Sequence, residues 1–217
     1  MPKQTFLNLP KLKRDAFLQV AIEEFAGRDY ESASISHIVA KLGIAKGSVY
    51  QYFADKRDLY LFLIEFASRE RKAFVQRTPP LDPHQDFFAY TQWLLEMGVR
   101  FTFEHPLLNQ IIFRAMFGAV PFRDELLLRM KESSLVLIRD VIAQGQATGE
   151  INPDLDLEMV AYVMNLITSD FSNYLVSKLV LNPQQLIDGD YSHLDTTAIS
   201  AVSAKAVAIV LYGLAKR

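Results

Sequence analysis

The chain has 217 residues, half of them hydrophobic and 22% charged, so it can bury a sizeable core in one or two domains. It contains no cysteine, which excludes a disulfide framework and thiolate chemistry and agrees with the cytoplasmic location that we expect. The net charge is only −2, but residues 1–77 hold 13 Lys+Arg against 9 Asp+Glu, the basic excess expected where one part of a protein meets phosphate.

The first ten residues show no apolar run long enough for a signal peptide, and we expect them to be loose. From Lys11 to Gly27 apolar residues recur at helical spacing, which predicts a helix. Residues 28–33 form the expected linker to the next helix. The longest nearly apolar run, residues 206–215, is too short to span a bilayer, so no membrane partner is expected.

Residues 34–56 predict two short helices joined by a tight turn, in a helix-turn-helix arrangement. Ser34 or Ser36 occupies the N-cap position, and Gly43 can end the first helix in the left-handed conformation. The second helix is expected from about residue 45 to residue 52. Apolar residues form the inner face and polar residues the outer face, which would enter a major groove; the alternative is a helical hairpin whose polar face is merely solvated.

The polar outer face carries small, cationic and aromatic groups that suit contacts with DNA. Gly47 permits close approach to the groove, Lys46 can reach a guanine edge or a phosphate, and Gln51 can pair with adenine. Backbone N–H groups and hydroxyls at the start of the first helix can donate to phosphate. The candidate contacts on this face are Ser34, Ser36, Lys46, Gly47, Ser48, Tyr50 and Gln51.

The run GIAKGSVYQYFADKRDLY resembles the signature of the TetR family of bacterial transcriptional repressors. The likeness lies in the small-Lys-Gly-Ser run, the Tyr-x-Tyr-Phe tail, and the acidic residue and Lys that open the next helix; it is close over about residues 11–70. The resemblance implies phosphate contacts from Tyr52 and Lys56. It also implies a homodimer that binds a palindromic operator in double-stranded DNA and pairs through its last two long helices.

A helix is predicted from Asp55 to about Arg77, with Asp55 as its N-cap. Its residues 59–66 are apolar almost all round, so we expect it to be buried on several sides and to connect a head to a body. The predicted domains are a DNA-binding head at residues 1–56 and an effector-binding and dimerisation domain at residues 78–217, joined by this helix.

The body is predicted to be helical throughout, and no segment of the chain alternates as a strand would. The fold class is therefore all-α, with a three-helix head and a larger helical body. Helices are expected at residues 87–105, 107–118, 121–149, 157–181 and 196–216, with a loop at residues 182–195.

Nine aromatic residues fall within residues 87–122. They could line a pocket for an apolar or aromatic effector, but most of them are expected to be plain core. The better pocket candidates lie where polar residues interrupt the apolar stretches. Arg114 would suit a carboxylate and Asp170 a cation, and the sequence does not choose between them. The candidate pocket residues are Trp93, Met97, Phe101, Phe113, Arg114, Phe117, Asn165 and Asp170.

A stripe on each of the last two helices is the candidate dimer interface; the alternative is that both stripes are intramolecular core. Its residues are Met164, Thr168, Phe171, Leu175, Val202, Ala206, Ile209 and Val210.

The sequence lacks the GxxxxGK[ST], GxGxxG, GxSxG and HExxH motifs, and its four histidines show no metal-ligand spacing. We therefore expect neither an enzyme nor a cofactor or metal site. The predicted function is a ligand-responsive repressor. The alternatives are a helical small-molecule-binding protein without a transcription role and a TetR-like activator.

Overall fold

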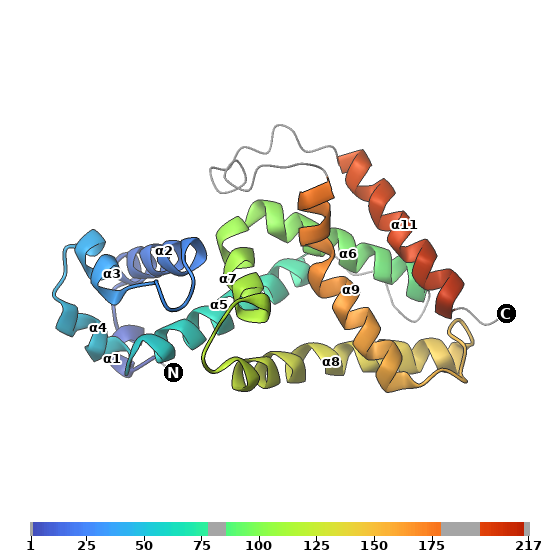
Figure 1. Ribbon diagram of the computed structural model, residues 1–217, viewed down its shortest axis with the longest axis horizontal. Helices are drawn as coiled ribbons and strands as arrows, with labels where there is room; N and C mark the ends of the chain where they lie inside the picture. Colours follow the sequence, from blue (N-terminus) through green and yellow to red (C-terminus); the bar gives the residue numbers. More distant parts are fainter. Residues whose placement is uncertain (1, 78–85, 179–195, 215–217) are drawn as a thin grey trace. The chain divides into compact units, whose positions relative to one another are not determined.

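The structure, a computed structural model, describes residues 2–77, 86–178 and 196–214, and it is helical with no strand among them (Figure 1). The all-α prediction is confirmed. The predicted loop at residues 182–195 lies outside the described residues. The helices are α1 Gln4–Leu7, α2 Lys11–Gly27, α3 Ile35–Leu42, α4 Lys46–Tyr52, α5 Lys56–Arg77, α6 Phe87–Glu104, α7 Pro106–Phe117, α8 Arg123–Thr148, α9 Leu157–Lys178 and α11 Thr196–Leu214.

The chain divides into two compact units. Unit 1 comprises Met1–Lys72 and Leu107–Leu127, and unit 2 comprises Ala73–Pro106 and Leu128–Arg217. The predicted head therefore shares its unit with α7 and the beginning of α8. Helix α5 contributes residues to both units.

The turn between α3 and α4 has the caps that the sequence indicates. Ser34 is the N-cap of α3, and its hydroxyl accepts a hydrogen bond from the Ser36 N–H at 3.2 Å. Gly43 ends the helix with φ 66°, and the Ile44 N–H donates to the Val39 carbonyl at 3.1 Å. These bonds satisfy backbone groups that a helix end leaves without partners, and they set the direction in which α4 begins.

The predicted N-cap of α5 is also confirmed. The Asp58 N–H donates to Asp55 Oδ1 at 2.7 Å, and the Ala54 N–H donates to Asp58 Oδ2 at 3.0 Å. This arrangement is a variant of the capping box, in which the third helical residue accepts from the residue before the cap and not from the cap itself. It fixes the point at which the chain leaves α4 and enters α5.

The expectation that the first ten residues are loose is wrong, because they contain α1. Such a short helix is unstable alone, and tertiary packing of one side chain stabilises it. Phe6 is only 1% exposed. Its ring contacts four others, with centroids 5.0–5.8 Å away: Phe17, Tyr52, Phe53 and Phe62.

Unit 2 is built around α6, which packs against both α9 and α11 (Figure 1). Asp86 caps α6 by accepting from the Ala89 N–H at 2.8 Å. No described helix is long and apolar enough to cross a membrane. One core cluster joins the three helices through Leu95, Val99, Phe103, Phe171, Leu175, Ile199 and Val207.

Replacement of a glycine by alanine should have opposite effects on stability at two positions of the helix-turn-helix. Neither Gly43 nor Gly47 has an atom within 4 Å of an added Cβ, so only backbone conformation distinguishes them. We expect Gly43→Ala to destabilise the protein by about 1–2 kcal/mol, because its φ is positive. Gly47→Ala, within a helix, should stabilise it by up to about 1 kcal/mol. Urea unfolding measures both, and equal changes would contradict the left-handed cap.

Candidate nucleic-acid interface

The outer face of α4 is open to solvent, and its inner face is fully buried. Lys46, Gly47, Tyr50 and Gln51 are exposed, whereas Val49 is 1% exposed. Ser36, in the first turn of α3, is exposed as well, and Ser34 and Ser48 are half-buried. The structure thus brings these predicted contacts together on two consecutive short helices, with the small and polar groups outward.

The N-terminal residues hold the C-terminal end of α4. The last carbonyls of a helix have no partner within the helix, and here three consecutive carbonyls receive donors from outside it. The Lys3 N–H donates to the Tyr52 carbonyl at 2.8 Å, and Lys3 Nζ donates to the Tyr50 carbonyl at 2.7 Å. Thr5 Oγ1 donates to the Gln51 carbonyl. The ammonium group of Lys3 also suits the negative end of the helix dipole.

Tyr52 and Lys56 both have partners within the head. The half-buried Tyr52 packs its ring at 5.7 Å from Phe17. Lys56 Nζ donates to the Glu31 carbonyl at 3.0 Å and lies 4.6 Å from the ring centroid of Tyr30. Their phosphate contacts stay predictions, and Lys56 would have to exchange the Glu31 carbonyl for a phosphate oxygen.

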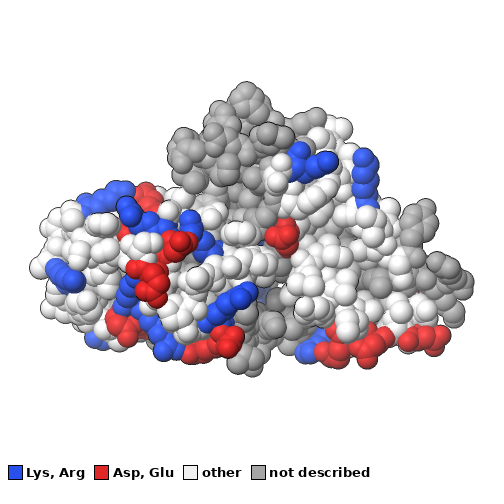
Figure 2. Space-filling view, in the orientation of Figure 1, with Lys and Arg blue, Asp and Glu red and all other residues white. Residues whose placement is uncertain are grey.

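Glu24 of α2 joins the two helices that precede the recognition surface, and the sequence analysis missed it. Its Oε1 accepts from the Ser34 N–H at 2.8 Å and lies 3.2 Å from His37 Nδ1 and 3.4 Å from Arg28 Nε. Figure 2 likewise shows acidic side chains interspersed with the basic ones on the head, at the left of the view. The positive excess is therefore not one uninterrupted patch in that view.

Arg114 of α7 is attached to the end of α2. Its Nε donates to the Ala26 carbonyl at 2.8 Å, and its Nη1 forms an ion pair with Asp29. The guanidinium group is therefore occupied within unit 1. The sequence placed Arg114 in a pocket because it interrupts an apolar stretch, and nothing in the local pattern indicated a partner so far along the chain.

An aromatic contact lies beside this attachment. Phe122 packs edge-on against Tyr30 at 5.1 Å and Tyr60 at 6.2 Å, and Arg57 pairs with Glu125 of α8. Burial raises the pKa of Tyr60 to about 12 and also raises that of Tyr30. Both phenols stay neutral at physiological pH, so they act here as packing groups rather than charges.

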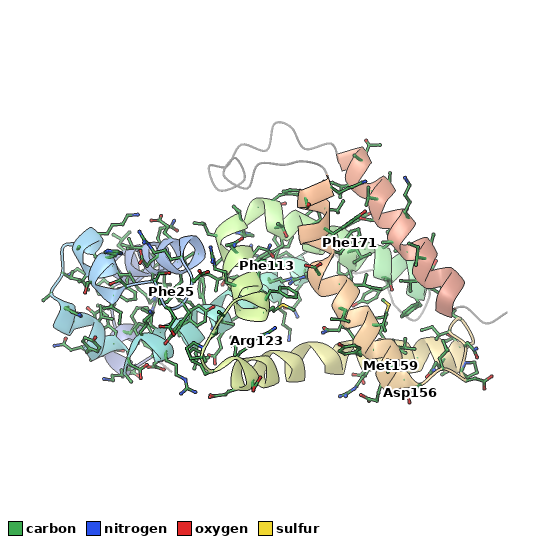
Figure 3. All side chains as sticks on the ribbon, viewed as in Figure 1. Phe25, Phe113, Arg123, Asp156, Met159 and Phe171 are labelled. Carbon is green, nitrogen blue, oxygen red and sulfur yellow. The ribbon has the colours of Figure 1, made fainter. Side chains whose placement is uncertain are left out.

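The eight candidate pocket residues are divided between the two units. Phe113, Arg114 and Phe117 lie on α7 in unit 1. Their two phenylalanine rings are 4.9 Å apart, and Figure 3 labels Phe113. In unit 2, Met97 and Phe101 are buried, Trp93 and Asn165 are half-buried, and Asp170 is exposed. Among the described residues, no group of acidic or histidine side chains could hold a metal ion.

Half of the candidate dimer residues are already covered within one chain. Met164, Phe171, Leu175 and Val210 are buried in unit 2. Thr168, Val202 and Ala206 are half-buried, and Ile209 is 75% exposed. A different face of α9 exposes large apolar side chains (Figure 3 labels Met159 among them): Met159, Tyr162, Val163, Leu166 and Tyr174.

Two family models together match most of the chain. The family described as "Bacterial regulatory proteins, tetR family" matches residues 17–62. The family described as "Tetracyclin repressor-like, C-terminal domain" matches residues 85–215.

Similar proteins of known name are regulators as well. A TetR family transcriptional regulator from Chloroflexus aurantiacus J-10-FL is 38% identical, with all of both chains covered and a TM-score of 0.85. The transcriptional repressor KstR2 of Mycolicibacterium smegmatis is 26% identical over 159 residues, which cover 70% of this chain and 73% of KstR2. FadR of Bacillus subtilis, solved with stearoyl-CoA, shares 13% identity over 92% of this chain and 98% of its own, with a TM-score of 0.67; it shows likeness of fold.

Removing the donors at the end of α4 should loosen that helix. We expect the double variant Lys3→Met/Thr5→Val to lose about 1–3 kcal/mol of stability, because two carbonyls of α4 each lose a hydrogen-bond donor. Amide hydrogen exchange in α4 should rise before that of α2. Lys13→Met removes the same charge from an exposed lysine and serves as the control. Unchanged exchange in α4 would show that the N-terminal contacts do not hold it.

Proposed function

Because the chain belongs to the TetR family of DNA-binding transcriptional regulators, we propose that it is a repressor whose homodimer binds a palindromic operator and releases it when an effector binds. The observation that carries the proposal is the outer face of α4. Lys46, Gly47, Tyr50 and Gln51 are exposed there, while the opposite side of the helix is packed and its C-terminal carbonyls are bonded. A short helix held from behind in this way can enter a major groove without changing shape.

The proposed contacts divide into positioning and reading. The Ser36 hydroxyl, exposed in the first turn of α3, would donate to phosphate and help to set the register of the head. Gln51 would read a base edge, and Lys46 a guanine or a neighbouring phosphate. Gly47 carries no side chain, so the backbone of α4 can lie close to the bases.

The exposed apolar face of α9 supports the homodimer. Met159, Tyr162, Val163 and Leu166 follow the 3, 4, 7 spacing of one helical face, and all four are exposed in the single chain. A contiguous apolar face of this kind marks an interaction surface on a soluble protein. A second copy of the chain would cover it with the same face, as a two-fold axis requires, together with the exposed Ile209 of α11.

The route from effector to DNA is proposed to use two connections. One is α5, which follows α4 directly and contributes to both units. The other is α7, which Arg114 attaches to the Ala26 carbonyl and to Asp29 at the end of α2. An effector that favours a different position of either helix would change the orientation of α4 and so the affinity for DNA.

Substitutions on α4 should reduce operator binding without unfolding the protein. We expect Gln51→Ala to cost about 1–3 kcal/mol of discrimination at one base position, and Lys46→Ala to lower the salt slope by about one unit. The operator is first selected from random duplexes, and affinities are then measured by fluorescence anisotropy. Lys205→Ala, at an exposed lysine of α11, is the control. Wild-type affinity in both α4 variants would place the recognition surface elsewhere.

Charges placed on the exposed face of α9 should separate the protomers. We expect Tyr162→Glu/Leu166→Glu to sediment as a monomer in analytical ultracentrifugation, because association would bury two carboxylates without partners. Leu12→Glu places a carboxylate at an exposed leucine of α2 and should leave the dimer intact. A dimer in the double variant would exclude this face as the interface.

A further inference from the structure

His37 of α3 and Glu24 of α2 form a pair at the start of α3. His37 Nδ1 lies 3.2 Å from Glu24 Oε1. The side chain of Glu24 is only 12% exposed, whereas that of His37 is 58% exposed. The same carboxylate oxygen also accepts the Ser34 N–H at 2.8 Å. One nitrogen of the imidazole thus contacts a held carboxylate, while more than half of the side chain is open to solvent.

Residues of two helices share the capping of α3. Ser34 is the N-cap, and His37 is the third residue of the helix, the position at which a capping box has Glu or Gln. That side chain ordinarily accepts the N–H of the N-cap. Here Glu24 accepts it instead, and the side chain of His37 contacts Glu24. No hydrogen bond to His37 Nε2 is formed within the described part of the chain, so this nitrogen is open to a partner from outside.

The other charges beside this pair balance each other. On α2, Arg28 Nε lies 3.4 Å from the same oxygen of Glu24. On α3, Lys41 follows His37 by one turn and pairs with Glu23, and its hydrogen bond lowers the pKa of that carboxyl group. Two carboxylates and two cations sum to zero. The protonation of His37 therefore decides whether this part of the head is neutral or positive.

The neighbouring elements add no further ion pair to His37 among the described residues. The loop between α2 and α3 carries Asp29, which pairs with Arg114, and the exposed Glu31. Helix α4 carries one charged residue, the exposed Lys46. The charge that His37 meets within the head is thus that of Glu24.

His37 also lies beside a residue for which we propose contact with DNA. Ser36 precedes it in the first turn of α3, and both side chains are exposed. Consecutive side chains of a helix point about 100° apart. Two such side chains can contact different phosphates of one strand, and a phosphate contact positions the head whatever the base sequence.

We propose that the protonated imidazole of His37 donates from Nε2 to a phosphate of the operator, so that operator binding takes up a proton. The inference rests on the proposed function and adds one contact and one pH dependence to it. Glu24 is a positioning residue: it accepts from Nδ1 and so fixes the orientation of the ring. A phosphate beside Nε2 favours the charged ring, because a hydrogen bond between two ions is stronger than one between neutral groups.

The sign of the pH dependence follows from this proton uptake. The complex binds more protons than the free protein, so affinity for the operator rises as the pH falls. Histidine is the side chain that ordinarily changes charge between about pH 5 and pH 8. We expect the wild type to bind about tenfold to a hundredfold more tightly at about pH 6 than at about pH 8, since both heads of the proposed dimer contribute.

The test compares His37→Asn with His37→Lys. The asparagine amide can still donate to Glu24 but has no charge and no counterpart of Nε2, whereas lysine stays charged throughout this pH range. Affinities for the duplex selected from random DNA are measured by fluorescence anisotropy at constant ionic strength. We expect His37→Asn to bind at every pH as the wild type does at about pH 8, and His37→Lys to bind tightly at every pH. His105→Asn, the same replacement on α6, should keep the pH dependence of the wild type.

Salt dependence supplies a second readout. At about pH 6 the slope of binding against log salt should be smaller for His37→Asn than for the wild type by about one unit per head. A wild type without pH dependence, or His37→Asn with the same pH dependence, would overturn the inference. Equal weakening in His37→Asn and His37→Lys at every pH would show a structural role and overturn it as well. Failure of every protein to bind any selected duplex would count against the proposed function instead.

Discussion

The packing of Phe6 against the aromatic side chains beside α4 is the contact on which the proposed DNA-binding surface depends. Helix α4 has seven residues, too few to be stable through its own backbone bonds. Its orientation therefore comes from tertiary contacts: its residue Val49 and its C-cap Phe53 are buried, and Lys3 and Thr5 supply donors to its last carbonyls. Stability of the head and geometry of the recognition surface are thus set by the same contacts.

Because α7 is attached to α2, the compact unit that contains the head extends beyond the residues 1–56 that the sequence predicts for it. Arg114 reaches a backbone carbonyl and a carboxylate at once, which is a strong use of a guanidinium group. With Phe122 against Tyr30 and Tyr60, these contacts make α7 and the start of α8 part of the compact unit that holds the helix-turn-helix.

Local chemistry made much of the fold predictable. Gly43, Ser34 and Asp55 mark helix ends by their own conformational and hydrogen-bonding preferences, and all three occupy the expected caps. Helix α1 was missed because four residues show no periodicity, and burial of Phe6 depends on residues from three other helices. Arg114 was assigned to a pocket because it interrupts an apolar stretch. Its actual partners lie 85–88 residues away in the sequence, so no local pattern could indicate them.

Helix α9 shows why the exposed apolar face, the proposed dimer interface, was harder to predict than the helix itself. It is apolar on more than one side, so spacing alone does not tell which side meets α6. The structure turns Met164 and Phe171 inward and leaves Met159 and Tyr162 exposed.

The length of helix α5 determines how far a small tilt moves its end. Its 22 residues make it about 33 Å long, so a tilt of about 10° about one end would move the other by about 6 Å, more than the ~3.4 Å rise of one base pair. In the homodimer that we propose, a rotation small enough to preserve every helix would therefore be sufficient to take the two heads out of step with their half-sites.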